Sequence, residues 1–296
     1  MKSVSAAEQL PLPIFAEFGL WHGQAPANFD VNFLGQRTDV SFNSDWSDSE
    51  RTRDRQARPP YPPLSEETFE WIALFRAILE AGKSFTMVEL GAGYGRWLVA
   101  AACAIRRRRP DLTVRLMGVE PEPTHFRWLL KHFADNNLRR EDHYLIEGAV
   151  GIKDAEAFLT RAADPAANYG QRLVASIEEA RSHGADTTFK VSTYALASLL
   201  DKFNFIDLID MDIQGAELDV LSAAVDDLQR KVKRIHVGTH SYEIESDLRG
   251  TFARMGWNCE SDFSCLGRRE TIYGYVDFED GVQTWVNPSF SGSIAV

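Results

Sequence analysis

Short apolar runs alternate with amphipathic stretches along most of the chain, and this alternation predicts the fold. The apolar runs suit buried strands, and they lie at Phe85–Leu90, Val114–Val119, Tyr144–Val150, Phe205–Met211 and Val232–Gly238. The stretches between them place apolar residues at helical spacing, at Trp97–Arg107, His125–Asn136, Thr193–Lys202, Ala216–Lys231 and Glu243–Met255. A strand followed by a helix, repeated about five times, predicts an α/β fold with a parallel sheet and helices on both faces.

The rhythm changes in two places. Trp257–Phe263 and Thr271–Phe278 follow each other as predicted strands with no helix between them, which predicts a terminal antiparallel hairpin. Lys153–Thr188 is irregular and polar, and it predicts an insertion after the third strand. We therefore expect one α/β domain over residues 65–296, interrupted by an insertion at about 153–188.

The first 64 residues differ from this domain. They hold seven of the twelve prolines, which disfavour long helices because proline fixes φ and lacks the amide donor. We expect an irregular arm with short strands at Asp30–Leu34 and Asp39–Phe42. Ser44–Arg58 is dense in Ser, Asp and Arg and predicts an exposed or mobile loop, and Pro59–Pro63 predicts a stiff linker. Ser65 is the predicted N-cap of a helix that follows the linker.

Composition narrows the class of protein. The 296 residues carry a formal net charge of -11, which disfavours nucleic acid as the main partner. Three scattered cysteines, Cys103, Cys259 and Cys265, form neither a disulfide framework nor a zinc motif, and we expect reduced thiols. Neither a secretory signal nor an apolar stretch of ~18 residues is present, so we expect a cytoplasmic protein without a membrane span.

A glycine-rich loop, Glu89-Leu90-Gly91-Ala92-Gly93-Tyr94-Gly95, joins the first strand of the sheet to the next helix. A tight turn at a helix N-terminus exposes backbone N–H groups, so this loop predicts a nucleoside ligand. The dinucleotide fingerprint fits less well, because the third glycine comes one residue early and Arg96 follows it. Glu89 would repel a pyrophosphate, but it suits the cationic amino group of S-adenosylmethionine.

The next two strands extend the predicted cofactor site. Glu120 and Pro121 end the second strand, where a carboxylate can accept both ribose hydroxyls. Small apolar residues after the third strand, Ala149 and Val150, would enclose the adenine ring. A plain tight turn and a dinucleotide site stay open as alternatives.

Four separated blocks make the chain resemble the FkbM-type methyltransferases. These blocks are Val88-Glu89-Leu90-Gly91-Ala92-Gly93-Tyr94-Gly95, Val119-Glu120-Pro121-Glu122-Pro123, Gly148-Ala149-Val150-Gly151 and Asp207-Leu208-Ile209-Asp210-Met211-Asp212-Ile213-Gln214-Gly215-Ala216-Glu217. Where the family usually has Glu in the last block, this chain has Gln214, to which we assign no catalytic role. The resemblance implies a class I methyltransferase fold, a Rossmann-like sheet of seven strands with the last one antiparallel. It also implies S-adenosylmethionine as methyl donor and usually a hydroxyl acceptor on a polyketide, sugar or glycan.

The carboxyl ends of two neighbouring strands carry the candidate catalytic residues, Asp212 and His240. Histidine suits the base that removes the acceptor proton, and Asp212 also belongs to the expected cofactor site. A divalent metal ion held by Asp212, Glu217 and His240 is the alternative. Asp212 could instead cap the following helix, and His240 could be an ordinary loop residue. His236 lies deeper in its strand and is interpreted as a core histidine.

The sequence thus predicts an S-adenosylmethionine-dependent O-methyltransferase that acts on a hydroxyl of a sugar, glycan or secondary metabolite. An NAD(P)-dependent oxidoreductase on the same sheet and a non-catalytic S-adenosylmethionine-binding protein are the alternatives. Asn168-Tyr169-Gly170, in the insertion, is a candidate contact point for the small-molecule or glycan acceptor, or else a plain surface loop.

Overall fold

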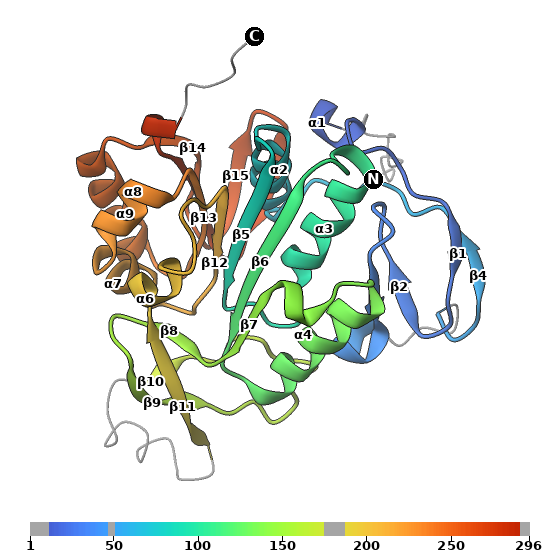
Figure 1. Cartoon of the computed structure of the whole chain (residues 1–296), viewed down its shortest axis with the longest axis horizontal. Coiled ribbons are helices and arrows are strands. Elements are labelled where there is room, and N and C mark those ends of the chain that lie inside the picture. The colour runs from blue at the N-terminus through green and yellow to red at the C-terminus, as the bar shows by residue number, and fades with distance from the viewer. Residues whose placement is uncertain (1–11, 47–50, 175–186, 291–296) are drawn as a thin grey trace, which may run out of the picture.

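One mixed sheet organises the part of the chain that the computed structural model describes, which is residues 12–46, 51–174 and 187–290 (Figure 1). Its seven strands run in the order β14-β17-β13-β12-β5-β6-β7. Their bounds are β5 Ser84–Leu90, β6 Thr113–Glu120, β7 Tyr144–Glu147, β12 Leu208–Met211, β13 Arg234–Thr239, β14 Asn258–Phe263 and β17 Gly281–Val286. β17 is antiparallel to both of its neighbours, and the other pairs are parallel. This is the class I methyltransferase topology, as predicted.

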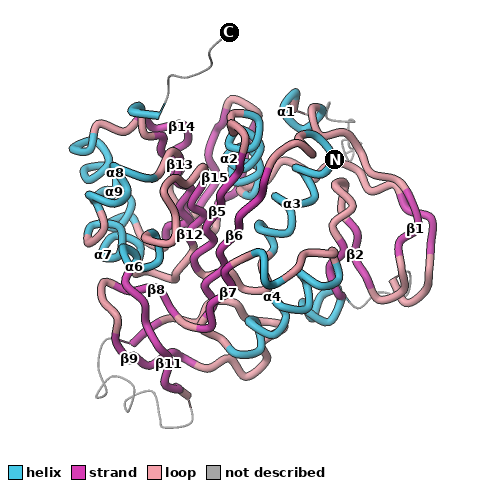
Figure 2. Tube along the Cα trace, in the orientation of Figure 1, coloured by secondary structure: helices cyan, strands magenta, loops and turns pink. Residues whose placement is uncertain are grey.

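Helices cover both faces of the sheet (Figure 2). One face carries α2 Glu67–Leu79, α3 Arg96–Arg108 and α4 Pro123–Asp135, and the other carries α6 Leu196–Leu200, α7 Glu217–Ser222, α8 Val225–Lys231 and α9 Tyr242–Met255. Successive strand residues point to opposite faces, so Met87 packs in the α2–α4 core and Val88 in the α6–α9 core. Glu89 follows in this alternation and therefore points to the same face as Met87.

The predicted C-terminal hairpin is wrong in its pairing. β14 pairs with β17 and not with the segment Thr271–Phe278. Most of that segment belongs instead to a separate hairpin of β15 Gly267–Thr271 and β16 Gly274–Phe278. β17 lies between β13 and β14 and is buried at every position, whereas β16 is exposed at alternate positions. Because Gln283 and Thr284 are polar, β17 contains no continuous apolar run that would predict a buried strand.

The insertion is also more regular than predicted. β8 Ala149–Gly151, β9 Ala155–Thr160, β10 Leu173–Val174 and β11 Thr188–Ala195 form a second sheet in the order β10-β9-β11-β8. Ala149, Leu159 and Val191 give it a small core of its own. The expected third strand breaks at Gly148 into β7 and β8, and the expected helix Thr193–Lys202 begins as the end of β11. Residues 175–186 of the insertion lie outside the described residues.

The N-terminal arm folds against α2. It contains α1 Pro13–Ala16, the pair β1 Gly23–Ala25 with β4 Arg55–Ala57, the pair β2 Phe29–Val31 with β3 Arg37–Asp39, and 3-10 turns at Val40–Phe42 and Ser44–Trp46. The predicted strand Asp39–Phe42 is thus mostly a turn, because Asp39 accepts the Ser41 N–H. β4 likewise gives the predicted loop Ser44–Arg58 a paired strand. Phe15 and Phe33 of the arm contact Trp71 and Phe75 of α2. Residues 1–11 and 47–50 lie outside the described residues.

Two helix boundaries differ from the predictions. α2 begins at Glu67 with Glu66, not Ser65, at the N-cap position and no side-chain cap; the Ser65 N–H donates to Thr68 Oγ1. The helix expected at Ala216–Lys231 is divided into α7 and α8. Short 3-10 turns at Arg140–Asp142 and Pro288–Phe290 complete the described elements. None of the described helices combines the length and apolar character that crossing a membrane requires.

Candidate active site

A cavity of about 380 Å³ opens at the carboxyl ends of β5, β6, β12 and β13. Most of the residues predicted to bind the cofactor line this cavity, namely Glu89, Gly91, Ala92, Gly93, Tyr94, Glu120, Pro121, Ala149, Val150 and Asp212. Gly95 is absent from the lining. It is the N-cap residue of α3 and has a φ of 72°, and a Cβ there would overlap the Leu129 side chain. Glycine is therefore needed at this position for the packing of α3 against α4.

The glycine loop lies against both neighbouring strand ends. The Gly93 N–H donates to Glu120 Oε2 and the Glu122 N–H donates to Glu120 Oε1, each at a distance of 2.7 Å. A Cβ on Gly91 would overlap the carbonyl oxygen of Asp212, so glycine permits the close approach of the loop to the end of β12. Glu120 is 5% exposed, and burial raises its pKa to about 8. The loop therefore brings two carboxyl groups into one cavity: that of Glu120, which is predicted to bind the ribose, and that of Asp212, which is predicted to be catalytic.

Glu89 has a structural partner that the sequence did not predict. Its carboxylate accepts the backbone N–H groups of Leu98 at 3.1 Å and Trp97 at 3.4 Å, in the first turn of α3. A negative charge at this helix end is favourable. Burial, together with the charge of Asp210, raises the pKa of Glu89 well above its usual value. Glu89 therefore anchors α3 to β5 while it lines the cavity.

Asp212, Glu217 and His240 come together as predicted, and we call them the rim cluster. His240 Nδ1 donates to Glu217 Oε1 over 3.0 Å, and His240 Nε2 lies 3.3 Å from Asp212 Oδ1. Gln214 Nε2 donates to the same Asp212 oxygen over 2.8 Å. Of the three, Asp212 lines the cavity, whereas His240 and Glu217 lie behind it.

His240 is held as a cation. Burial alone would lower its pKa, but the carboxylates of Asp212 and Glu217 outweigh burial and raise the pKa to about 10. An imidazolium has no lone pair with which to accept a proton or bind a metal. The base role predicted for His240 therefore does not fit this geometry, whereas a role in holding Asp212 does.

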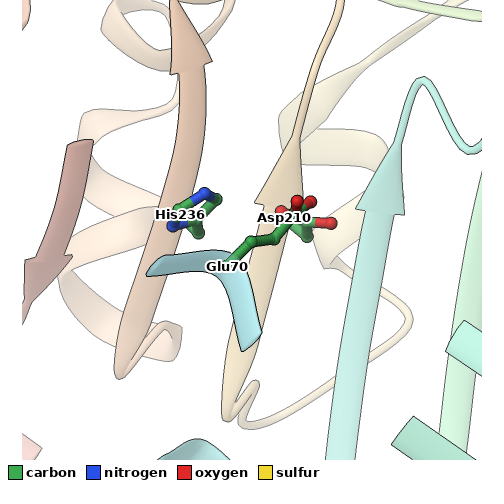
Figure 3. A group of neighbouring side chains, drawn as sticks. All are labelled: Glu70, Asp210 and His236. Atoms are coloured by element: carbon green, nitrogen blue, oxygen red, sulfur yellow. The ribbon is translucent and has the colours of Figure 1, made fainter. Parts of the chain in front are cut away.

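A second cluster lies deeper in the same cavity and was not predicted. Glu70 of α2, Asp210 of β12 and His236 of β13 point toward one another (Figure 3), and we call them the floor cluster. Glu70 and Asp210 hydrogen-bond to each other, and burial raises the pKa of both carboxyls. His236 Nδ1 bonds to Thr284 Oγ1 at 2.8 Å, and burial lowers the pKa of His236 to about 3. His236 is thus a neutral, buried histidine, as interpreted from the sequence, but it also faces the cavity.

One sequence signal could have revealed the floor cluster. Asp210 interrupts the buried strand Leu208–Met211, whose three remaining residues are all apolar. A carboxyl at such a position is expensive to bury without a partner or a function. Glu70 carries no such signal, since α2 also has Glu67 in its first turn.

The insertion and the arm form the roof of the site. The Tyr169 ring stacks on His125 with centroids 4.1 Å apart, and the Tyr169 hydroxyl donates to the Phe42 carbonyl. The Ser44 N–H donates to the Ala166 carbonyl over 3.1 Å. A Cβ on Gly93 would lie 3.3 Å from the Tyr169 ring, which places this ring directly over the glycine loop. Of the candidate contact residues 168–170, Tyr169 thus lines the cavity.

Comparisons with known proteins identify the family of this chain. Residues 89–261 match the model of the Methyltransferase FkbM domain. A protein of Jannaschia sp. (strain CCS1), described as "Putative methyltransferase", is 30% identical over 201 residues, which cover 65% of this chain and 69% of that protein.

Two solved structures show lower similarity. The methyltransferase FkbM from Methylobacillus flagellatus KT is 16% identical with a TM-score of 0.44, and the match covers 69% of this chain but 44% of that chain. The precorrin-6y C5,15-methyltransferase from Geobacter metallireducens GS-15 is 12% identical with a TM-score of 0.43, and the match covers 77% of this chain and 92% of that chain. On the strength of the family match and the curated relative, the chain belongs to the FkbM methyltransferase family and is an S-adenosylmethionine-dependent methyltransferase.

Proposed function

We propose that this enzyme is an O-methyltransferase that methylates a hydroxyl group of a sugar, glycan or secondary metabolite. The observation that carries the proposal is the position of Asp212. Its carboxylate lines the cavity beside the glycine loop and is held by Gln214, which also lines the cavity, and by His240 behind it. A fixed carboxylate next to the methyl-donor site suits the removal of a proton from a hydroxyl as that hydroxyl attacks.

S-adenosylmethionine fits the other lining residues. The glycine loop suits its methionine end, because Gly91 and Gly93 let a ligand approach the backbone closely, and Glu120 keeps lone pairs for the ribose hydroxyls. Pro121, Ala149 and Val150 suit the adenine ring. When bound, the sulfonium supplies an electrophilic methyl group.

The chain's own residues then handle the proton. As the acceptor oxygen bonds to the methyl carbon, the carbon–sulfur bond breaks and the hydroxyl proton passes to Asp212. His240 is a positioning residue, because its charge fixes the Asp212 oxygen at 3.3 Å. The imidazolium occupies the place that a metal would take, so we derive no step through a metal at the rim cluster.

The test is transfer of a labelled methyl group to a panel of sugars, glycans and hydroxylated metabolites, with the product bond identified by mass spectrometry and NMR. We expect a methyl ether, and we expect Asp212→Asn to lower kcat at least ~100-fold. Asp219→Asn, an exposed carboxylate on α7, is the matched control and should keep full activity. Methylation of nitrogen or carbon only, or a fully active Asp212→Asn, would refute the proposal.

Cofactor binding is measured separately by calorimetry with S-adenosylhomocysteine. Glu120→Gln should weaken binding about tenfold, because the amide replaces one of the two carboxyl oxygens by an NH₂ group that cannot accept a ribose hydroxyl. Glu147→Gln changes the exposed residue opposite Glu120 in β7 and serves as the control. Tight binding together with no turnover on any acceptor would favour the non-catalytic alternative.

A further inference from the structure

We propose that the floor cluster, Glu70, Asp210 and His236, binds one divalent transition-metal ion at the bottom of the active-site cavity. The site is distinct from the rim cluster, where a histidine already supplies the positive charge. The proposal concerns binding of the ion itself and does not rest on the identity of the methyl acceptor.

The three side chains already have the spacing of a metal site. One ligand atom from each lies within 4.8 Å of the other two. Bonds of ~2.0–2.2 Å to a common ion place its ligands up to about 4 Å apart, so a small inward movement closes the site. The residues come from α2, β12 and β13, and rigid elements of this kind hold ligands accurately (Figure 3).

His236 independently offers an unpartnered nitrogen to the cavity. Its Nδ1 is engaged by Thr284 Oγ1 at 2.8 Å, on the side away from β12. Its Nε2 has no hydrogen-bond partner among the described residues, although the side chain is 4% exposed and lines the cavity. When Nδ1 donates to Thr284 Oγ1, the Nε2 lone pair is free to bind a metal ion.

The surrounding sheet is polar where a core would be apolar. Glu89, Asp210, His236 and Thr284 are direct neighbours in one row across β5, β12, β13 and β17. All four are buried. Burying such a row costs free energy unless its groups bind something. Glu89 and Thr284 have partners in the protein, and this leaves Asp210 and His236 facing the cavity.

Charge balance points to a cation. Glu70 and Asp210 place two carboxyl groups side by side in the floor of the cavity, an arrangement that favours a bound cation. The guanidinium whose charge reaches them is that of Arg96, and Glu67 holds it through two hydrogen bonds of 2.6 Å. Among the described residues, no cationic side chain forms an ion pair with Glu70 or Asp210.

The ligand set selects the ion. One imidazole and two carboxylates suit Zn²⁺ or Mn²⁺ better than Mg²⁺ or Ca²⁺, which prefer oxygen ligands alone. Three protein ligands leave coordination positions open toward the cavity, which is the pattern of a catalytic rather than a structural site.

The test is titration of Zn²⁺ alone into the full chain after treatment with a chelator, followed by calorimetry. We expect one ion per chain, and we expect Asp210→Asn and His236→Gln each to weaken binding at least ~100-fold. Glu66→Gln alters a cavity-lining carboxyl at the start of α2 outside the cluster, and it should bind normally. Co²⁺ provides a second readout, since its visible spectrum should change when the His236 nitrogen is lost.

Thr284→Val keeps the shape of the side chain and all three ligands, so it tests the site even where a ligand variant fails to fold. It should weaken Zn²⁺ binding about tenfold, because it frees the imidazole to rotate. Absence of saturable binding overturns the proposal, and so does binding that survives Asp210→Asn but is lost in Glu217→Gln. Neither S-adenosylmethionine nor an acceptor is present, so failure here leaves the methyltransferase proposal untouched, and failure of methyl transfer leaves this one untouched.

Discussion

The floor and rim clusters contain the same residue types, but the histidine is neutral in the floor cluster and charged in the rim cluster. Each has one histidine and two carboxyls, and they share the strand ends of β12 and β13. In the floor cluster burial lowers the pKa of His236 to about 3. In the rim cluster the pKa of His240 rises to about 10, although burial again acts to lower it.

The difference lies in what the carboxyls contact. At the floor, Glu70 and Asp210 bond to each other, and His236 bonds to a neutral hydroxyl. At the rim, Glu217 and Asp212 lie on either side of His240. Burial penalises every charge, so a histidine stays charged only where carboxylates contact it directly. The partners of each histidine, and not the composition of the cluster, therefore give the cavity a rim with a charged histidine and a floor with a neutral one.

Removing a rim carboxylate should have the largest effect on folding. The Glu217 side chain is fully buried, and its Oε1 accepts from Ile213 N, Gly215 N and His240 Nδ1. Glu217→Ala leaves a partly buried imidazolium with one partner fewer and two backbone N–H groups without their acceptor, so we expect a loss of about 3–5 kcal/mol in the free energy of unfolding. Urea denaturation followed by circular dichroism measures it. The matched change at the floor, Glu70→Ala, should cost clearly less, and equal losses would erase the distinction between the clusters.

This comparison also shows what the sequence could and could not predict. The alternation of apolar runs and helices was enough for the sheet, because strand and helix periods are local properties. The motif blocks placed Gly91, Gly93 and Glu120 in one cavity for the same reason. The sequence did not predict β17, since its burial depends on two neighbouring strands rather than on the polarity of its own residues.

The floor cluster escaped for a related reason. Glu70 lies 140 residues before Asp210 in the chain, and only the packing of α2 on β12 and β13 unites them. The charge of His240 was equally hidden. Its sequence context shows a histidine at a strand end, whereas its protonation depends on Glu217 from another element.

The second effect is catalytic and separates positioning from folding. His240→Gln removes the charge that fixes Asp212, so we expect kcat to fall about 30-fold, or about 2 kcal/mol, with little change in KM for S-adenosylmethionine. A merely structural role would instead lower stability and leave the pH profile of kcat unchanged. His143→Gln, a histidine outside the cavity, is the control. A His240→Gln enzyme within threefold of the native kcat contradicts the assignment.

The third effect concerns pH and the floor carboxyls in metal-free protein. Their folded pKa values lie above the unfolded ones, so the folded state binds more protons. Their stabilising contribution is complete below the unfolded pKa of about 4 and is lost as pH rises through the raised folded values. We expect the free energy of unfolding to fall by about 1–2 kcal/mol between about pH 5 and pH 8, and Asp210→Asn to flatten this slope. An unchanged slope in Asp210→Asn would show that other groups cause it.

The last prediction concerns the protonation states of the two histidines, which ¹⁵N NMR of the metal-free protein measures directly. The ring of His236 should show one protonated and one bare nitrogen down to about pH 4, while both His240 nitrogens stay protonated up to about pH 9. Glu217→Gln removes one charge beside His240 and should bring its titration toward the ordinary range near 6.5, leaving His236 unchanged. If both native histidines instead titrate together near 6.5, the two clusters do not differ in charge. His240 is then free to act as the base, and the floor loses its claim to be the neutral, metal-binding side of the cavity.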